Sequence, residues 1–163
     1  MKRVALFPGT FDPITIGHLD IIHRALPLFD KLIIGIGRNA NKTAMFSEEL
    51  RLQWVNEIYK DEPNVSAIIY EGLTIECCQR VGANFIIRGI RYVNDFEYEK
   101  AIADMNRSLD PEIETVFLTC LPQYTSVAST LVRDVIRNGG DVTQFLPEVV
   151  ADTLSKKNPL VRK

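Results

Sequence analysis

The sequence predicts a Rossmann-like α/β fold, with a doubly wound, five-stranded parallel sheet and helices on both faces. Apolar runs bounded by turn residues alternate along the chain with segments of helical periodicity, the pattern typical of α/β proteins. Runs such as residues 32–34 and 85–87 are continuously apolar, as expected of parallel strands buried on both faces. With 163 residues, of which 46% are hydrophobic, the chain is long enough to form one domain with its own core.

We expect five strands, at residues 4–7, 32–36, 65–70, 85–87 and 115–121. Helices are expected at about 17–29, 47–60, 73–82, 95–108, 129–138 and 147–155. In the first helix, Leu19, Ile22, Leu26 and Phe29 repeat at helical spacing on one face. Pro27 lacks an N–H group, so this helix should kink or stop early.

The later helices have local start and stop signals. Ser47 is suited to cap the second helix, and Pro147 fits the first turn of the last. Gly139 and Gly140 should end the fifth helix, after an apolar stripe that begins at Leu131. The whole chain, 1–163, is expected to be a single domain, with a polar and basic tail at 155–163.

Composition excludes several classes of protein. There are 19 basic and 21 acidic side chains, a net charge of −2, so no charge footprint for nucleic acid is present. Cys77, Cys78 and Cys120 form neither a disulfide framework nor a zinc-ligand pattern, and indicate free thiols in a reducing compartment. No apolar segment has the length of a signal peptide core or a membrane span, so we expect a cytoplasmic protein without membrane contact.

The most informative segment is residues 8–18, PGTFDPITIGH, which follows the first apolar run. It reads as a strand, a turn and a helix start. Free backbone N–H groups and about half a positive charge gather at a helix N-terminus, which makes it a site for anions. Gly9 and Gly17 allow a ligand to approach the backbone, and His18 would lie in the first helical turn. Any one of these residues fits an ordinary turn, but together they predict a phosphate site with a functional side chain.

Further candidate residues follow other strands, whose carboxyl ends form the ligand edge of an open α/β sheet. Arg88 and Arg91 flank Gly89 and suit phosphate. Taken alone, ion pairs with Asp95, Glu97 or Glu99 would explain them equally well, but their place at a strand end favours phosphate. Lys42 in a polar loop is either a phosphate contact or a solvated side chain. The hydroxyl groups of residues 124–130 are suited to cap a helix or to hold a second anion.

Other chemical motifs are missing or incomplete. Residues 35–40 resemble a dinucleotide fingerprint only loosely, because no helix is expected to open at their second glycine. His18 and His23 are five residues apart, which does not suit a helical metal pair, and no nucleophile lies in a recognisable catalytic motif. The sequence thus offers two phosphate-binding centres and several basic side chains, but no recognisable nucleophile. This combination favours transfer of a phosphoryl-type group directly between two bound substrates.

The sequence resembles the nucleotidyltransferase superfamily with the T/HxGH signature, here Thr15, Gly17 and His18. Within that superfamily it is most similar to the phosphopantetheine adenylyltransferase family. The resemblance rests on residues 8–18, on RGIR at 88–91 with DFEYE at 95–99, on MNR at 105–107 and on GDVTQFLP at 140–147. These segments extend over essentially the whole chain.

The resemblance implies that ATP and 4′-phosphopantetheine react with Mg²⁺ to give dephospho-coenzyme A and pyrophosphate, by in-line attack without an adenylated enzyme. The catalytic residues would be His18, which stabilises the transition state, with Thr10 and Lys42, which orient the attacking phosphate. The phosphopantetheine site would comprise Thr10, Lys42, Thr74 and Arg88. The ATP site would comprise Thr10, Phe11, His18, Gly89, Ile90, Arg91, Glu99, Tyr124, Thr125, Ser126, Val127, Ala128, Ser129 and Thr130. Ser129 and Thr130 would contact its phosphates.

Members of the family are hexamers that coenzyme A often inhibits, so a homohexamer with coenzyme A as a feedback inhibitor is expected. The chain departs from the family pattern at Ala128, where a serine is usual, at Thr74, where an apolar residue is usual, and at Phe7, where tyrosine is common. Two other functions remain open from the residues alone. One is a non-catalytic nucleotide-binding module, and the other is an adenylyl- or cytidylyltransferase with a different acceptor.

Overall fold

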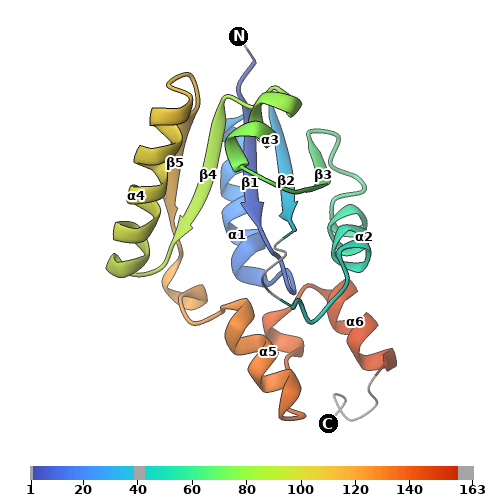
Figure 1. Cartoon of the computed structure of the whole chain (residues 1–163). Coiled ribbons are helices and arrows are strands. Elements are labelled where there is room, and N and C mark those ends of the chain that lie inside the picture. The colour runs from blue at the N-terminus through green and yellow to red at the C-terminus, as the bar shows by residue number, and fades with distance from the viewer. Residues whose placement is uncertain (1, 39–42, 158–163) are drawn as a thin grey trace.

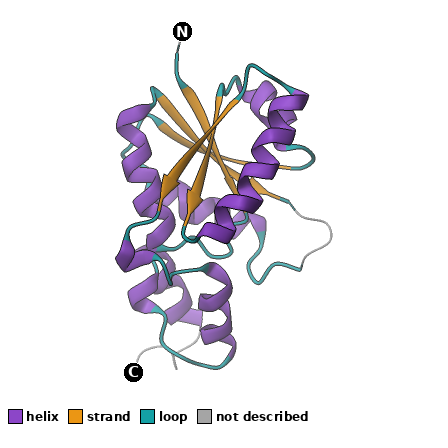
Figure 2. Cartoon of the chain, turned by 90° about the vertical axis from the view of Figure 1, so that its left-hand side faces the viewer, coloured by secondary structure: helices purple, strands orange, loops and turns teal. Residues whose placement is uncertain are grey.

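Five parallel strands form a single sheet with helices on both faces, in a computed structural model that describes residues 2–38 and 43–157 (Figures 1 and 2). The strands are β1 (Val4–Gly9), β2 (Lys31–Gly37), β3 (Val65–Tyr70), β4 (Phe85–Ile90) and β5 (Glu114–Thr119). The α-helices are α1 (Ile16–Ala25), α2 (Glu48–Ile58), α3 (Thr74–Val81), α4 (Val93–Leu109), α5 (Ser129–Arg137) and α6 (Glu148–Lys157). The predicted fold class and all eleven predicted elements are confirmed.

The strand order is β3-β2-β1-β4-β5, so the chain reverses direction across the sheet after β3. β1 is the central strand, and Leu6 is paired with Ile33 on one side and with Ile86 on the other. Ligands of open α/β sheets bind where the strand order reverses, outside the carboxyl ends of the strands. In this fold that point lies between β1 and β4, at the end of the sheet where α5 and α6 lie (Figure 1).

The sheet has an apolar core on each face. α1 and α2 cover one face, where Ile22 and Val55 pack with strand residues such as Ile34 in the larger cluster. α3 covers the other, where Ile75 and Cys78 belong to the smaller cluster with Leu6. The continuous apolar runs of the strands are therefore explained, because alternate side chains enter opposite cores.

Several local predictions are confirmed. α1 ends at Ala25 and gives way to a short 3₁₀ turn, Leu26–Leu28, which contains Pro27. The hydroxyl of Ser47 accepts the N–H of Leu50 and caps α2. Gly139, which follows α5, has a φ of 73°, a conformation that glycine adopts without strain.

The strand ends differ from the prediction. β4 continues to Ile90, so Arg88 and Gly89 lie within the strand and not after it. The reason is the neighbouring strand, since Arg88 and Gly89 are in register with Phe117 and Leu118 of β5. β1 likewise extends through Pro8 to Gly9 along β2.

Three further expectations can be compared with the structure. β2 ends at Gly37 and α2 begins at Glu48, so no helix opens at the second glycine of the loose dinucleotide fingerprint. Within residues 2–38 and 43–157, no helix is both long and apolar enough to cross a membrane. All three cysteines are free thiols, with Cys77 and Cys78 buried and Cys120 partly exposed.

Candidate active site

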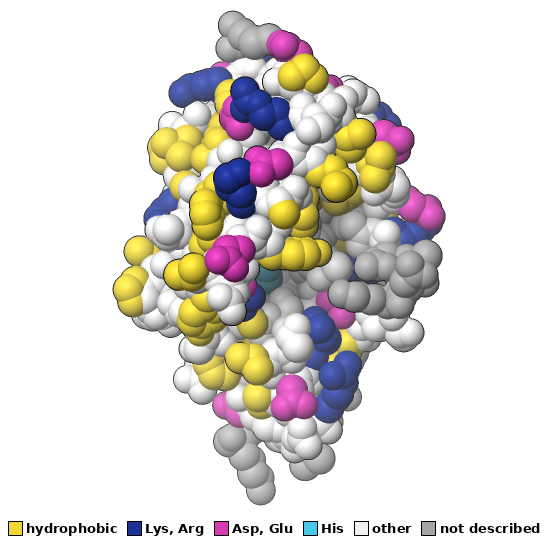
Figure 3. Space-filling model, turned by 60° about the vertical axis from the view of Figure 1, so that its left-hand side comes forward, with side chains coloured by type: hydrophobic (Ala, Val, Ile, Leu, Met, Phe, Trp, Pro, Cys, Tyr) yellow, Lys and Arg dark blue, Asp and Glu magenta, His cyan; other side chains and the backbone are white. Residues whose placement is uncertain are grey.

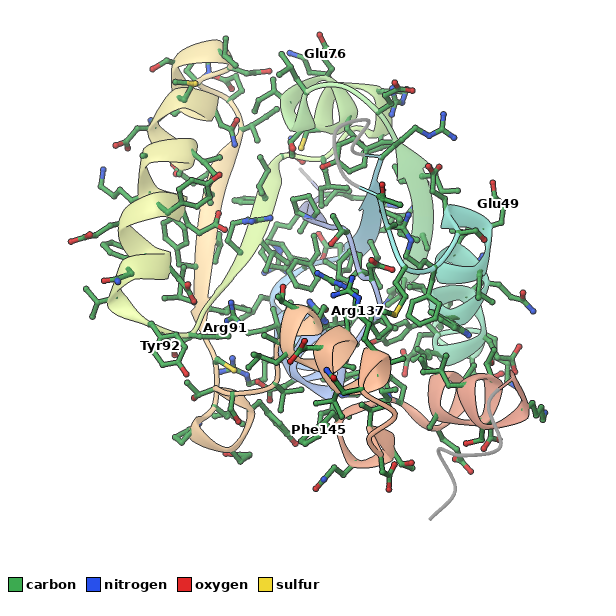
Figure 4. The ribbon with its side chains drawn as sticks, turned by 60° about the horizontal axis from the view of Figure 1, so that its bottom comes forward. Glu49, Glu76, Arg91, Tyr92, Arg137 and Phe145 are labelled. Atoms are coloured by element: carbon green, nitrogen blue, oxygen red, sulfur yellow. The ribbon has the colours of Figure 1, made fainter. Side chains whose placement is uncertain are left out.

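A cavity of about 830 Å³ opens at the carboxyl ends of the strands, within the size range of small-molecule sites. Its walls are the β1–α1 segment, the end of β4, the start of α2 and the N-terminal turn of α5. The space-filling view shows the surface hollowed on this face, with basic side chains at the edge (Figure 3). Arg91 lies on the β4 side of the site and Glu49 on α2 across from it (Figure 4).

Most of the predicted site residues line this cavity. They are Thr10, Phe11, His18, Arg88, Gly89, Arg91, Glu99, Val127, Ala128, Ser129 and Thr130. Five others do not, namely Thr74, Ile90, Tyr124, Thr125 and Ser126. Thr74 lies at the start of α3, where its hydroxyl is 3.1 Å from the hydroxyl of Tyr70. Lys42 lies outside the described residues, and its neighbour Thr43 lines the cavity. The predicted phosphate segment and the β4 arginines are thus brought together at one cavity.

His18 is held in a fixed orientation by the residue that precedes α1. Its Nδ1 accepts the backbone N–H of Thr15 at 3.0 Å and is 2.9 Å from the Thr15 hydroxyl oxygen. The ring also meets the ring of Phe11 edge-on, with 5.1 Å between centroids. Since Nδ1 accepts a hydrogen bond, the proton of the neutral ring is assigned to Nε2, which becomes the donor available to a ligand.

The surroundings of His18 favour its neutral form. Burial of the ring, followed by the positive charges of Arg91 and Arg88, lowers the pKa of His18 to about 4. At neutral pH the ring is therefore an uncharged hydrogen-bond donor at the N-terminus of α1, where the helix itself favours negative charge.

We expect His18 to remain neutral from pH 8 down to about pH 5 in the ligand-free protein. The ¹⁵N and ¹H resonances of the imidazole should show the Nε2–H form at pH 7 and no transition near pH 6.5, with the signal assigned by its loss in His18→Gln. A midpoint near 6.5 would contradict this environment. Because the unfolded chain takes up the proton first, His18 should also make the fold less stable as pH falls from 6.5 towards 4.

Arg88 in β4 and Arg91 directly after it both form ion pairs. Arg88 donates to Glu99 through Nε at 2.6 Å and Nη2 at 2.5 Å, and also to the carbonyl of Pro8 at 2.8 Å. The Nε atom of Arg91 lies 3.4 Å from Oδ2 of Asp95. The ion pairs weighed for these residues are therefore present, and both arginines also line the cavity, so their contact with phosphate stays a prediction. Glu99, one of the three partners that the sequence offered for these arginines, fixes the orientation of Arg88.

Residues of α5 form the wall of the cavity that faces the carboxyl ends of the strands. The Ser129 hydroxyl donates to the carbonyl of Pro13 at 2.8 Å and joins α5 to the β1–α1 segment. Arg133 donates from Nη1 to the carbonyl of Asp12 at 2.7 Å and from Nη2 to the Thr130 hydroxyl at 3.3 Å. Sequence reasoning missed Arg133, although its position three residues after Thr130 places both on one helix face.

The glycines of the phosphate segment have packing roles as well. A Cβ atom at Gly17 would lie 3.3 Å from the carbonyl oxygen of Val127, across the cavity wall. A Cβ atom at Gly9 would lie 3.0 Å from the ring of Phe11. The close approach at Gly9 is therefore made by Phe11, whereas the sequence interpretation attributed it to a ligand.

Among the described residues, the cavity offers donors but no activated nucleophile. The hydroxyl of Ser129 is engaged with Pro13, and burial is the main cause that raises the pKa of the Cys120 thiol. Arg88, Arg91 and Arg133 provide positive charge, and the His18 ring provides a neutral donor. Such an arrangement is suited to bind phosphate groups and to stabilise charge that develops on them.

Comparisons with known proteins agree with this chemistry. The model of the cytidylyltransferase-like family matches residues 6–135. A phosphopantetheine adenylyltransferase from Flavobacterium psychrophilum is 56% identical over 91% of this chain and 97% of its own length. The chain belongs to the phosphopantetheine adenylyltransferase family. A second member, from Bacteroides thetaiotaomicron, is 50% identical over 90% of this chain and 96% of its own length.

Solved structures outside the phosphopantetheine adenylyltransferases share the fold. A bifunctional NMN adenylyltransferase/ADP ribose pyrophosphatase from Francisella tularensis has a TM-score of 0.73 at 19% identity, over 99% of this chain and 52% of that one. At this identity the likeness concerns the fold alone. The specific relationship rests on the family members, which match this chain along nearly its full length.

Proposed function

We propose that the chain transfers the adenylyl group of ATP to 4′-phosphopantetheine, giving dephospho-coenzyme A and pyrophosphate. A phosphate oxygen of phosphopantetheine forms a bond to the α-phosphorus of ATP, and the bond from that phosphorus to the bridging oxygen of the β-phosphate breaks. The observation that carries the proposal is the neutral His18 ring, held by Thr15 at the start of α1 in an arginine-lined cavity. The similarity to phosphopantetheine adenylyltransferases supports the choice of substrates.

In this reaction, His18 donates its Nε2 proton in a hydrogen bond to an α-phosphate oxygen as negative charge grows there. A neutral donor stabilises that charge without giving up its proton. Thr10 and Lys42 orient the attacking phosphate, and Arg88, steadied by Glu99, binds the same substrate. Arg91, Ser129 and Thr130 hold the phosphates of ATP, and Arg133 lies beside them. Direct attack needs no protein nucleophile, which fits the side chains of the cavity.

We propose Mg²⁺ as the cation that accompanies ATP. Within the described residues, no group of three or more His, Cys, Asp or Glu side chains could hold a metal ion. Two carboxylates of the cavity are engaged with arginines, Glu99 with Arg88 and Glu48 with Arg38. Mg²⁺ is commonly bound through substrate phosphates and water with few protein ligands, so the nucleotide itself would carry the ion. When bound, it would neutralise phosphate charge.

We further propose a cytoplasmic homohexamer whose activity coenzyme A inhibits. Large apolar side chains are exposed along α4 and just before it, at Tyr92, Val93, Phe96, Tyr98 and Met105, which supports burial of α4 between copies (Figure 3). Sedimentation equilibrium should give about six times the chain mass of 18.5 kDa. A monomeric mass would contradict the assembly without affecting the proposed reaction.

Pyrophosphate release with a panel of substrates tests the proposed function. ATP with 4′-phosphopantetheine and Mg²⁺ should release pyrophosphate, whereas CTP with phosphopantetheine and ATP with nicotinamide mononucleotide should not. Release with another pair only would assign another acceptor or nucleotide. Nucleotide binding without release from any pair would favour a non-catalytic module.

A further inference from the structure

Three polar side chains are buried in the described part of the chain, two of them in the phosphate segment and the third in contact with it. They are Asp12 and Arg51, each 4% exposed, and Thr15, which is fully buried. Thr15 orients His18. Asp12 and Arg51 carry charges, and both line the cavity wall without having been assigned a part in the reaction.

Arg51 lies in the first turn of α2 and joins two separate segments. Its Nη1 donates to the carbonyl of Thr10 at 2.5 Å, across 41 residues of sequence. Its Nε donates to the carbonyl of Phe46 at 3.0 Å. One guanidinium group therefore fixes the backbone of the phosphate segment to the chain that leads into α2.

Asp12 joins the same two segments as a hydrogen-bond acceptor, whereas Arg51 is a donor. One carboxylate oxygen accepts the N–H of Met45 and the other accepts the N–H of Phe46, both at 2.9 Å. The backbone carbonyl of Asp12 accepts Nη1 of Arg133, whose guanidinium also lies 3.8 Å from the Asp12 carboxylate. Residues 10–12 are thus attached both to residues 45–46 and to α5.

Between these two attachments lies Phe11, whose φ is 47°. This left-handed conformation is unfavourable for a bulky residue and persists only where the surroundings determine it. The Phe11 ring is 2% exposed and packs edge-on against Phe7 and His18. Arg51 holds the peptide before Phe11, and Asp12 anchors the residue after it, so the strained backbone is constrained on both sides.

We propose that Asp12 and Arg51 are positioning residues for adenylyl transfer, which hold Phe11 in its strained conformation and so fix Thr10 beside it where it meets phosphate. The assignment rests on the proposed function for its catalytic consequence. A contribution to the stability of the fold would not explain these residues. Burial of a charge costs free energy, and an apolar side chain in its place often leaves the free energy of unfolding unchanged or raises it. The hydrogen bonds that these two side chains make go to backbone groups at the site, and the charged neighbour of Asp12, Arg133, also lines the cavity.

The test compares Arg51→Met, which keeps an unbranched side chain of similar reach, with Val55→Ala in the same helix. Val55 is fully buried in the core and does not line the cavity, so its truncation destabilises α2 without releasing Thr10. Arg51→Met should lower kcat by about 10²-fold with small changes in both KM values, because misplacement of groups around the reacting atoms acts on the rate. Val55→Ala should keep its kcat near that of the unaltered chain at temperatures well below its Tm.

Two further variants keep the test decisive if Arg51→Met does not fold. Arg51→Lys retains the positive charge and a single donor nitrogen, so it should recover part of the rate. Asp12→Asn keeps the shape of the side chain but loses one acceptor oxygen, so it should lower kcat with KM nearly unchanged. A kcat for these variants that falls no more than in Val55→Ala would overturn the proposal.

Hydrogen–deuterium exchange gives a readout that does not depend on the reaction. Exchange over residues 9–15 should be faster in Arg51→Met than in the unaltered chain, and unchanged in Val55→Ala. If the unaltered chain has no transferase activity, the proposed function fails, whereas the exchange result still shows whether Arg51 constrains this segment. Unchanged exchange in Arg51→Met would contradict the positioning role, whatever the activity.

Discussion

Replacing His18 with alanine should lower kcat by about 10²–10³-fold, with a much smaller change in the affinity for ATP. The Nε2–H group donates to charge that is present mainly in the transition state, and the other ring nitrogen is engaged with Thr15. The ground-state complex with ATP loses little, because Arg91 and the α5 residues still line the site. The measurement is steady-state kinetics together with calorimetric titration of ATP.

His23 provides a matched control for this substitution. It lies on the same helix, is exposed, and packs against Tyr59 away from the cavity. His23→Ala should therefore leave kcat unchanged. If His18→Ala loses ATP affinity and kcat to the same extent, His18 binds the ground state and the transition-state role is wrong.

Replacing Lys42 with alanine should raise KM for 4′-phosphopantetheine and lower kcat, for a combined loss in kcat/KM of about 10²-fold or more. The expectation comes from the family resemblance, since Lys42 lies outside the described residues. A lysine that orients the attacking phosphate contributes to binding as well as to the rate, so both constants should change. KM for ATP should change less.

The control for Lys42 is Lys60→Ala. Lys60 is exposed just after α2, where it pairs with Glu57 at 2.9 Å. Its removal takes away the same charge at a distance from the cavity and should leave both KM values unchanged. An enzyme that is equally unaffected by Lys42→Ala would show that Lys42 is a solvated loop residue.

The parts of the fold that local sequence determines were predictable, and the strand ends were not. Pro27 stopped α1 as expected, because the missing N–H group acts within the helix itself. Arg88 was placed after its strand, because an arginine following three apolar residues resembles a strand end. Its place within β4 depends on pairing with Phe117 of β5, which is distant from it in sequence.

The candidate site shows the same division. Residues 8–18 were predictable as a phosphate segment because strand, turn and helix start follow one another directly. Arg51 was not predictable, because an arginine in an amphipathic helix normally faces solvent, and its partners are carbonyl groups that only the folded chain brings near. Asp12 lies in the expected turn after the first strand, but the hydrogen bonds that its carboxylate accepts from the N–H groups of Met45 and Phe46 cross more than 30 residues of sequence.

Exchange of labelled pyrophosphate into ATP, measured with and without 4′-phosphopantetheine, tests most directly whether this cavity joins its two substrates in one step. Direct attack predicts no exchange with ATP and Mg²⁺ alone, and formation of dephospho-coenzyme A and pyrophosphate in equal amounts once phosphopantetheine is added. Exchange in the absence of phosphopantetheine would show an adenylated enzyme and contradict the direct mechanism. Absence of dephospho-coenzyme A from the complete mixture would contradict the proposed reaction itself.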